Sequence, residues 1–418
     1  MSIGYACLTI GVPNTDQKSC RQNHASEEKL AELIAYNLNA LENIIDYNIE
    51  NNILLFRISS DIIPFGSSPV NTLAWWDIFA PQFRRIGEKI RSSGMRVSMH
   101  PGQYTVLNSP NEEVVTRAIA DLKYHAKVLD SLGVGPACKI VLHIGGIYHE
   151  KEQAIHRFIA AYHRLDDAVK RRLVLENDDK SYTIKDVLMI GRLLHAPVIF
   201  DNLHHAIHHS GEQEDDLYWI NECKSTWSET DGNQKVHYSQ QDTAKQAGSH
   251  AQSIRIDEFM SYYNSVQRED LDIMLEVKDK NLSAVKCINC TAKGKRIKSL
   301  ELEWSKYKYN ILESAPANYL EIRKLLKNKN DYPAIPFYHL IEDALQQECT
   351  IGNSVNAAQH VWGYFKESAT EKEKNQFLKS IEKFEQGKTS IRAIKNILWK
   401  MTVQYQQLYL LDSYYFTL

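Results

Sequence analysis

Short apolar runs alternate with stretches of helical periodicity along roughly the first 280 residues, and this alternation limits the chain to a few folds. Parallel strands need crossover connections, usually helices, and eight such strand–helix units close a (β/α)8 TIM barrel. We therefore predict an α/β barrel with its strands at 3–10, 53–60, 96–100, 139–146, 173–178, 197–204, 235–239 and 272–278.

The connecting stretches support this interpretation. The clearest helix is predicted over 26–49, where Ser26 can cap the first backbone amides and the acids that follow suit a helix N-terminus. An open, doubly wound sheet is the rival fold. That fold normally carries a glycine-rich first turn, and the sequence contains neither a G-x-G-x-x-G motif nor a P-loop.

The rest of the chain has a different character. With 418 residues, the chain is long enough for a barrel of about 250 residues and a second unit. We predict a barrel domain over 1–285, a basic linker or helical segment over 286–330, and an all-α domain over 331–418. The basic segment could be a solvated linker or an edge that faces DNA. Cys287 and Cys290 form a C-x-x-C pair, which alone is a weak metal signal.

Composition narrows the class of protein only broadly. A hydrophobic fraction of 43% and a charged fraction of 24% are ordinary for a soluble globular protein. The net charge of −3 does not indicate a nucleic-acid binder, although a local basic rim would suffice. No run approaches ~20 apolar residues, the first residues lack a basic n-region, and the seven cysteines are scattered. We expect a cytoplasmic protein with no membrane partner.

Side chains that bind metals or exchange protons stand at the ends of six predicted strands. In a parallel barrel these ends meet at one mouth. Carboxylates this close cannot all stay ionised without compensation, and divalent cations supply it, since a carboxylate can bridge two of them. One histidine in an apolar run is usually a hydrogen-bonded core residue. Three imidazoles and three carboxylates at matching strand ends instead indicate a metal site: His100, His143, Glu176, Asp201, His237 and Glu276.

Further residues surround this predicted site. His204 lies three residues after Asp201, and His250 lies in the loop after the seventh predicted strand. Both could hold a further ion. Tyr5 is on the first strand, and Gln103 and Tyr104 follow a Pro-Gly turn that should project them over the mouth. A tyrosine in a loop is unremarkable by itself. In a nucleic-acid enzyme it can enter a base stack and support a displaced nucleotide.

Several stretches of the first 280 residues or so resemble the UV damage endonuclease family. They occur in the family's order: IGYACLTIG, LLFRISSDIIPFGS, MHPGQY, LHIGG, LVLENDD, IFDNLHH, KVHYS and MLEVKDKN. The resemblance implies a barrel related to endonuclease IV and to xylose isomerase-like enzymes. It also implies two or three divalent cations, typically Mn²⁺, with Zn²⁺, Mg²⁺ or Co²⁺ as other options. The implied reaction is incision immediately 5′ to a UV photoproduct, leaving a 3′-hydroxyl and a 5′-phosphate.

The resemblance also assigns roles to residues. Tyr5, Gln103 and Tyr104 match lesion-probing positions, and Lys235 matches a K-x-H lysine that would contact phosphate or balance charge. The catalytic residues implied are Glu176, Glu276, His143 and Lys235. The implied metal ligands are His100, His143, Glu176, Asp201, His204, His237, His250 and Glu276. One departure is Ser68, which stands where the family carries histidine, so one metal position is expected to be weaker.

The sequence therefore predicts a monomeric DNA-repair endonuclease that acts on damaged double-stranded DNA. Three alternatives remain open. An abasic-site endonuclease of the endonuclease IV type and a metal-dependent sugar isomerase or epimerase would use the same barrel. A protein with structural metals would bind damage without cutting. The C-terminal segment resembles a small helical bacterial domain of unknown function, and it could bind an unidentified partner.

Overall fold

A computed structural model describes residues 1–211, 214–266 and 268–418 of the chain. These residues form two compact units. Unit 1 consists of Met1–Thr9, Asn14–Ile254 and Ser261–Ile288, and unit 2 consists of Ile10–Pro13, Arg255–Met260 and Asn289–Leu418. Among the helices in these ranges, none combines the length and the apolar character needed to cross a membrane.

Unit 1 is built on a closed barrel of parallel strands, which confirms the predicted TIM barrel. Each strand pairs with the next along the chain, and β8 pairs with β1. Each strand overlaps a predicted apolar run. The strands are β1 (Ile3–Ala6), β2 (Leu55–Ile58), β3 (Arg96–Met99), β4 (Ile140–His143), β5 (Leu173–Glu176), β6 (Val198–Asp201), β7 (Gln234–Tyr238) and β8 (Leu271–Leu275).

Alternation along the strands decides which side chains face the barrel interior. Val174 and Ile199 belong to a buried cluster there. Glu176 and Asp201 lie two positions further along the same strands, so they face the same interior. The register pairs Asp201 with His237. These side chains therefore lie at a similar height along the barrel axis, at the carboxyl ends of the strands.

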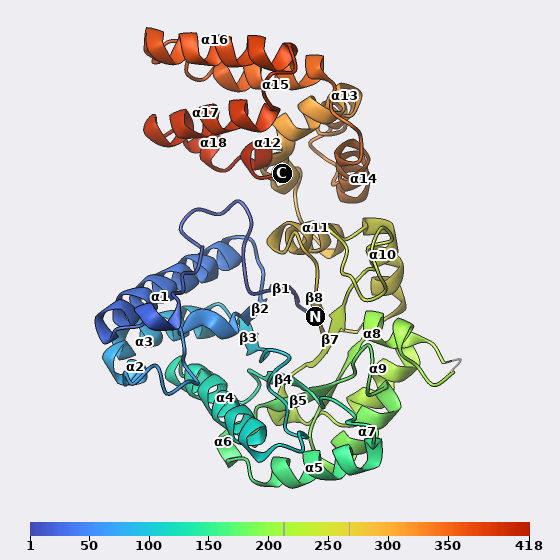
Figure 1. The fold of residues 1–418 in the computed structure, drawn as a ribbon. Helices are drawn as coiled ribbons and strands as arrows, with labels where there is room; N and C mark the ends of the chain where they lie inside the picture. Colours follow the sequence, from blue (N-terminus) through green and yellow to red (C-terminus); the bar gives the residue numbers. More distant parts are fainter. Residues whose placement is uncertain (212–213, 267) are drawn as a thin grey trace. The chain divides into compact units, whose positions relative to one another are not determined.

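Helices surround the ring of strands, as Figure 1 shows. The predicted cap of the first long helix is confirmed, because Ser26 Oγ accepts a hydrogen bond from Lys29 N at 3.2 Å. The helices are α1 (Glu27–Glu50), α2 (Trp75–Ile78), α3 (Ala80–Ser92), α4 (Glu112–Ser131), α5 (Lys151–His163), α6 (Asp167–Lys170), α7 (Ile184–Leu194), α8 (Asn202–Ile207), α9 (Asp216–Lys224), α10 (Ile256–Ser265) and α11 (Asn281–Thr291), with short 3-10 turns η1 (Gln22–His24), η2 (Ser60–Ile62) and η3 (Glu229–Asp231).

Unit 2 is helical, as predicted. The segment predicted over 286–330 as a basic linker or helical segment forms the end of α11 together with α12 and α13, and its residues from Asn289 on belong to unit 2. Tyr309 and Leu312 of α12 belong to the unit 2 core. The helices are α12 (Ile297–Ser314), α13 (Pro316–Leu325), α14 (Ala334–Leu345), α15 (Ile351–Trp362), α16 (Glu371–Glu385), α17 (Ile391–Gln404) and α18 (Leu408–Leu411), followed by the 3-10 turn η4 (Tyr414–Phe416).

The close approach of β1 and β2 depends on Gly4. A Cβ atom added to Gly4 would lie 1.9 Å from the Leu55 carbonyl oxygen. We expect Gly4→Ala to lower the free energy of unfolding by about 1–3 kcal/mol through overpacking, measured by thermal and denaturant unfolding. Gly135→Ala is the matched control, since no atom lies within 4 Å of its added Cβ. Equal stability of the two variants would contradict this account of the barrel.

Candidate metal centre

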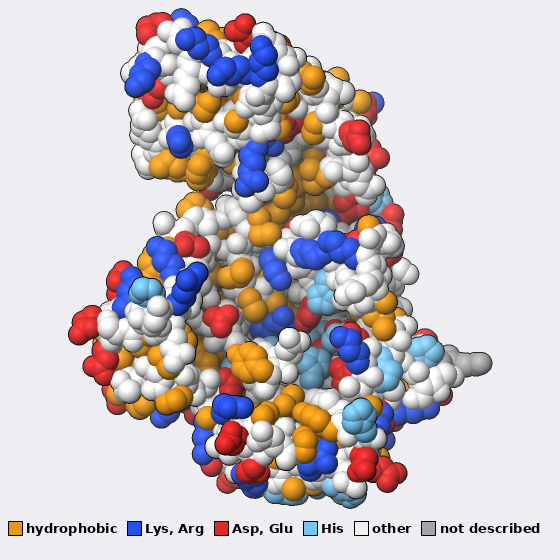
Figure 2. Space-filling view, in the orientation of Figure 1, with side chains coloured by type: hydrophobic (Ala, Val, Ile, Leu, Met, Phe, Trp, Pro, Cys, Tyr) orange, Lys and Arg blue, Asp and Glu red, His pale blue; other side chains and the backbone are white. Residues whose placement is uncertain are grey.

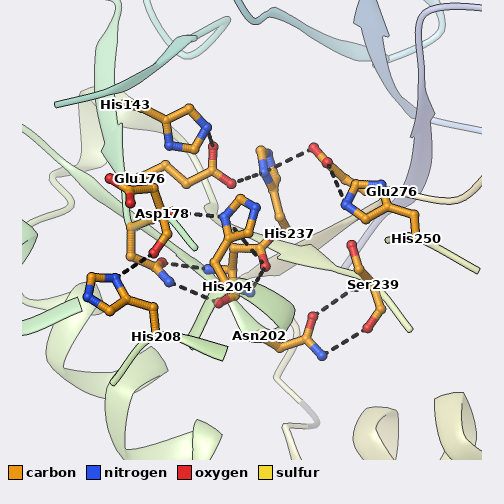
Figure 3. Close-up of polar contacts among 12 residues, drawn as sticks. His143, Glu176, Asp178, Asn202, His204, His208, His237, Ser239, His250 and Glu276 are labelled. Carbon is orange, nitrogen blue, oxygen red and sulfur yellow. Dashed lines mark hydrogen bonds and ion pairs between the residues drawn. The ribbon is translucent and has the colours of Figure 1, made fainter. Parts of the chain in front are cut away.

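Glu176 is the centre of the site at the barrel mouth. Its Oε1 lies 2.5 Å from His237 Nδ1, and its Oε2 lies 3.1 Å from His100 Nε2 and 3.5 Å from His143 Nε2. Figure 3 shows His143 and His237 turned toward this carboxylate from β4 and β7, and Glu276, just after β8, in contact with His237. A single buried carboxylate thus accepts contacts from three imidazoles.

Three overlapping groups of side chains could each hold a metal ion, and Glu176 belongs to all of them. Within each group the ligand atoms lie within 4.8 Å of one another. The groups are His100–His143–Glu176, Glu176–Asp201–His204 and Glu176–His237–Glu276. A carboxylate shared in this way is the arrangement that bridges neighbouring cations.

Burial and neighbouring charges set the protonation states of the site, and they leave Glu176 ionised and His100 neutral. Burial tends to raise the pKa of Glu176, but His237 and His143 hold that pKa well below its usual value. Burial lowers the pKa of His100 to about 4, so its ring is neutral and keeps a lone pair for a ligand bond. Burial raises the pKa of Asp201; the charge of His204 lowers it, but Glu176 and Glu276 raise it, so the pKa stays above its ordinary value. His204 thus compensates Asp201 only in part.

Unpartnered buried atoms provide a direct test of whether these residues fit a metal. His143 Nδ1, Asp201 Oδ2 and His237 Nε2 are buried without a hydrogen-bond partner. The other Asp201 oxygen, Oδ1, caps α8 by accepting from His204 N at 2.8 Å. An orphaned buried polar atom costs about 1–3 kcal/mol. Oxygen and imidazole nitrogen donors concentrated at one mouth fit divalent cations of borderline softness.

Arg57 is a residue of the site that the sequence analysis missed. It lies on β2 and forms an ion pair with Glu276 Oε1. Burial acts to lower the pKa of Arg57, but Glu276 raises it above its ordinary value. The alternation of β2 could have located it, because Leu55 and Arg57 share a face and Leu55 lies in the interior cluster. Arg57 offsets part of the negative charge at the mouth.

Lys235 lies inside the barrel, and its contact with a DNA phosphate stays a prediction. Its side chain is fully buried, and Nζ has no hydrogen-bond partner. Burial lowers the pKa of Lys235 to about 7, with Arg96 and Arg57 acting in the same direction. In the free chain its side chain is therefore closed off from the surface. Charge balance with Glu176, the other role expected of it, remains compatible with the structure.

The rim over the site is formed by the turn after β3. Gln103 is exposed and Tyr104 is 68% exposed, and the Tyr104 ring folds over Gly102, where a Cβ would lie 2.5 Å from it. Beside them is a cavity of about 310 Å³, lined in part by His143, His204 and Lys180. Figure 2 shows histidine, acidic and basic side chains in a hollow over the ring of strands.

Tyr5 lies away from this rim, which corrects its predicted contact with DNA. The side chain is fully buried, its hydroxyl donates to Asn48 Oδ1 at 2.8 Å, and its ring centroid lies 5.2 Å from that of Phe56. Asn48 is on α1, so Tyr5 faces the helical layer and not the barrel interior. Strand parity explains the difference, because Ala6 and not Tyr5 shares the interior face with Leu55.

Two other predicted positions stand at the edge of the site. His250 Nε2 lies 3.8 Å from Glu276 Oε2, but His250 belongs to none of the three groups. Ser68 Oγ accepts from Val70 N at 3.3 Å within its own turn, and Ser68 also lies outside the groups. Cys287 and Cys290 are in α11 and contribute to no group found among the described residues.

The fold and the site define a class: parallel-barrel proteins that present imidazole and carboxylate ligands at the carboxyl mouth. Comparison with known proteins gives the particular family. The chain belongs to the UV-endonuclease UvdE family, whose model matches residues 1–308. A second model, of a protein family of unknown function (DUF1722), matches residues 308–418.

Named relatives agree with this assignment. A UV DNA damage endonuclease of Clostridium perfringens is 39% identical over 403 residues, covering 94% of this chain and 95% of that protein. A UV DNA damage endonuclease of Bacillus cereus is 36% identical over 294 residues, covering 69% of this chain and 91% of that protein. The crystal structure of SacUVDE superposes with a TM-score of 0.66 at 38% identity, covering 72% of this chain and 99% of that chain.

The shared carboxylate predicts how the protein responds to divalent cations. We expect Mn²⁺ to raise the unfolding temperature of the wild-type chain, with a stabilisation of about 2.7 kcal/mol at 100 times the dissociation constant. Glu176→Gln should remove most of this shift, because Glu176 takes part in all three groups. Thermal unfolding with and without Mn²⁺ measures the shift. Exposed Glu152→Gln is the control, and a full shift in Glu176→Gln would contradict the assignment.

Proposed function

We propose that this protein nicks damaged double-stranded DNA immediately 5′ to UV photoproducts, both cyclobutane dimers and 6-4 products, by metal-assisted hydrolysis. The products would be a 3′-hydroxyl and a 5′-phosphate. The observation that carries the proposal is the trio of ligand groups joined through Glu176, at the open mouth of a barrel of the UvdE family.

The residues of the three groups would hold two or three divalent cations, with Mn²⁺ as our first choice and His250 as an additional ligand beside Glu276. Bound there, such cations acidify water and stabilise negative charge on a phosphate. The protein's own residues fix the charge state and the orientation of these ligands. Glu176 stays ionised because His237 and His143 hold its pKa low, and Arg57 orients Glu276 through their ion pair.

Lys235 would act through its charge, from the barrel interior below the three ligand groups. Its unpartnered Nζ lies inside the barrel, where Glu176 and Asp272 are the carboxylates that act on its charge. With a pKa lowered to about 7, Lys235 is partly protonated near neutral pH, and its protonated form in this low-dielectric place would balance negative charge that builds up at the mouth. His143, with one ring nitrogen near Glu176 and the other unpartnered, completes the set of proposed catalytic residues.

Substrate choice would come from the rim. A duplex that contains a photoproduct is already weakened in pairing and stacking, so deforming it costs less than deforming intact DNA. Tyr104 is exposed enough to enter the stack, and Gln103 lines the adjacent cavity. The two side chains would fill the space left by displaced bases and report the lesion by shape.

Loss of the shared carboxylate tests the chemistry. We expect Glu176→Gln to reduce nicking of UV-irradiated supercoiled plasmid below detection, because the variant disrupts every ligand group at once. The conversion of supercoiled to open-circular plasmid, followed over time in Mn²⁺, measures the rate. Glu152→Gln should nick at the wild-type rate. Nicking by Glu176→Gln at that rate would rule out the proposed metal chemistry.

Loss of the rim tyrosine tests recognition separately. We expect Tyr104→Ala to keep the Mn²⁺-induced stabilisation but to bind a dimer-containing duplex about tenfold or more weakly, since base–aromatic stacking contributes about 1–3 kcal/mol. Anisotropy with damaged, undamaged and abasic-site duplexes measures the preference. Exposed Tyr218→Ala on α9 is the matched control. An unchanged preference in Tyr104→Ala would exclude Tyr104 as the lesion probe, and tighter binding of the abasic duplex by the wild type would reassign the substrate.

A further inference from the structure

One surface of unit 2 gathers aromatic rings and basic side chains from separate helical segments. Its residues come from α12, α13, the turn after α15, and α18, and we name it the tyrosine–cation surface: Lys308, Tyr319, Arg323, Tyr364 and Tyr409. The proposed incision chemistry uses none of them. The surface includes part of the basic segment 286–330, which the sequence analysis leaves open between a solvated linker and a DNA-facing edge.

The rings of this surface are stacked and anchored. Tyr364 and Tyr409 lie nearly parallel, with centroids 5.7 Å apart and an interplanar angle of 11°. Tyr364 Oη accepts a hydrogen bond at 2.9 Å from the hydroxyl of Tyr309, which is buried in the core of unit 2. Tyr364 is 36% exposed and Tyr409 is 38% exposed, so both rings offer area to a ligand from a fixed position.

Two cations of this surface lie against tyrosine rings. Lys308 Nζ is 5.0 Å from the centroid of Tyr309 and 5.9 Å from that of Tyr409, and the Arg323 guanidinium carbon is 5.6 Å from the centroid of Tyr319. Within the described ranges, neither cation forms an ion pair with a carboxylate. Burial lowers the pKa of Lys308, and the charge of Arg323 lowers it further. The two positive charges therefore repel each other without an acidic partner.

A purely structural role does not account for this arrangement. Core packing explains Tyr309, but it does not explain two half-exposed stacked rings, with Lys308 against one of them and Arg323 against Tyr319, where neither cation pairs with a carboxylate among the described residues. An anion that also carries flat rings would satisfy both features, because bases stack on aromatic side chains and phosphates attract Lys and Arg. Residues 289–418 also carry more Lys and Arg than Asp and Glu, although the whole chain has a net charge of −3.

We propose that the tyrosine–cation surface binds single-stranded DNA, with a base on the Tyr364–Tyr409 pair and phosphates on Lys308 and Arg323. This rests on the proposed function only in taking DNA, and not RNA, as the nucleic acid. The surface is a second DNA contact, distinct from the barrel mouth. The Bacillus cereus relative aligns over only 69% of this chain, which fits a role that adds to incision without being required for it.

Binding of a dimer-free oligonucleotide by the full chain tests the proposal. The probe is fluorescein-labelled oligo(dT) of about 20 nucleotides, a length that spans several stacking sites, and its anisotropy gives the dissociation constant. We expect the double variant Lys308→Glu/Arg323→Glu to bind about tenfold more weakly. The matched control is Lys372→Glu/Lys379→Glu on α16, a helix that contains no tyrosine. It makes the same change in charge and should bind within about twofold of wild type.

The stacking contribution has its own test. We expect Tyr409→Leu to weaken oligo(dT) binding about tenfold and Tyr409→Trp to restore it, with unfolding temperatures unchanged in both. Equal weakening in the two charge-reversal variants would overturn the proposal in favour of diffuse attraction. Oligo(rU) bound as tightly as oligo(dT), or wild type that binds no oligo(dT), would also overturn it.

Incision separates this proposal from the proposed function. All tyrosine–cation variants should nick a short dimer-containing duplex at the wild-type rate, because the ligand groups lie in unit 1. Weaker oligo(dT) binding with normal nicking supports the second contact. If the wild-type chain does not nick but the expected changes in oligo(dT) binding are observed, the proposed function is contradicted. The assignment of the tyrosine–cation surface to single-stranded DNA is then unaffected.

Discussion

The whole site depends on one buried carboxylate placed among imidazoles. Glu176 contacts His100, His143 and His237 and belongs to each of the three candidate ligand groups. Burying a charge is costly unless it is paired, so the surrounding residues must supply compensation. Arg57 pairs with Glu276, while Asp201 keeps one oxygen without a partner. The chain therefore compensates part of its negative charge and leaves the rest for a cation.

The barrel explains why this concentration of charge is tolerated. Parallel strands bring their carboxyl ends to one mouth, and the apolar residues two positions earlier on the same strands fill the interior below. The ligand side chains therefore lie directly above a well-packed apolar interior. Residues on the turns above them are exposed and can contact a ligand. Tyr104 illustrates this division, because it extends from a turn while its neighbour His100 takes part in the centre.

Unit 2 adds a second kind of surface to the protein. Its core is helical and aromatic, and its tyrosine–cation surface combines stacking rings with unpaired positive charge. The barrel mouth is instead rich in carboxylate and imidazole. Under the two proposals these chemistries would suit different features of DNA, since one would act on a phosphodiester and the other would hold bases and backbone without reaction.

The amino-acid sequence alone determined the barrel, the helical C-terminal region and the set of residues at the strand ends. These follow from periodicity, because apolar alternation and strand-end chemistry are local properties of the chain. Only the tertiary structure decided which groups meet. It makes Glu176 common to the three ligand groups and pairs Arg57 with Glu276. It also buries Lys235 and Tyr5 and places residues of α12 in the core of unit 2. Burial and pairing depend on residues distant in sequence, so no local pattern encodes them.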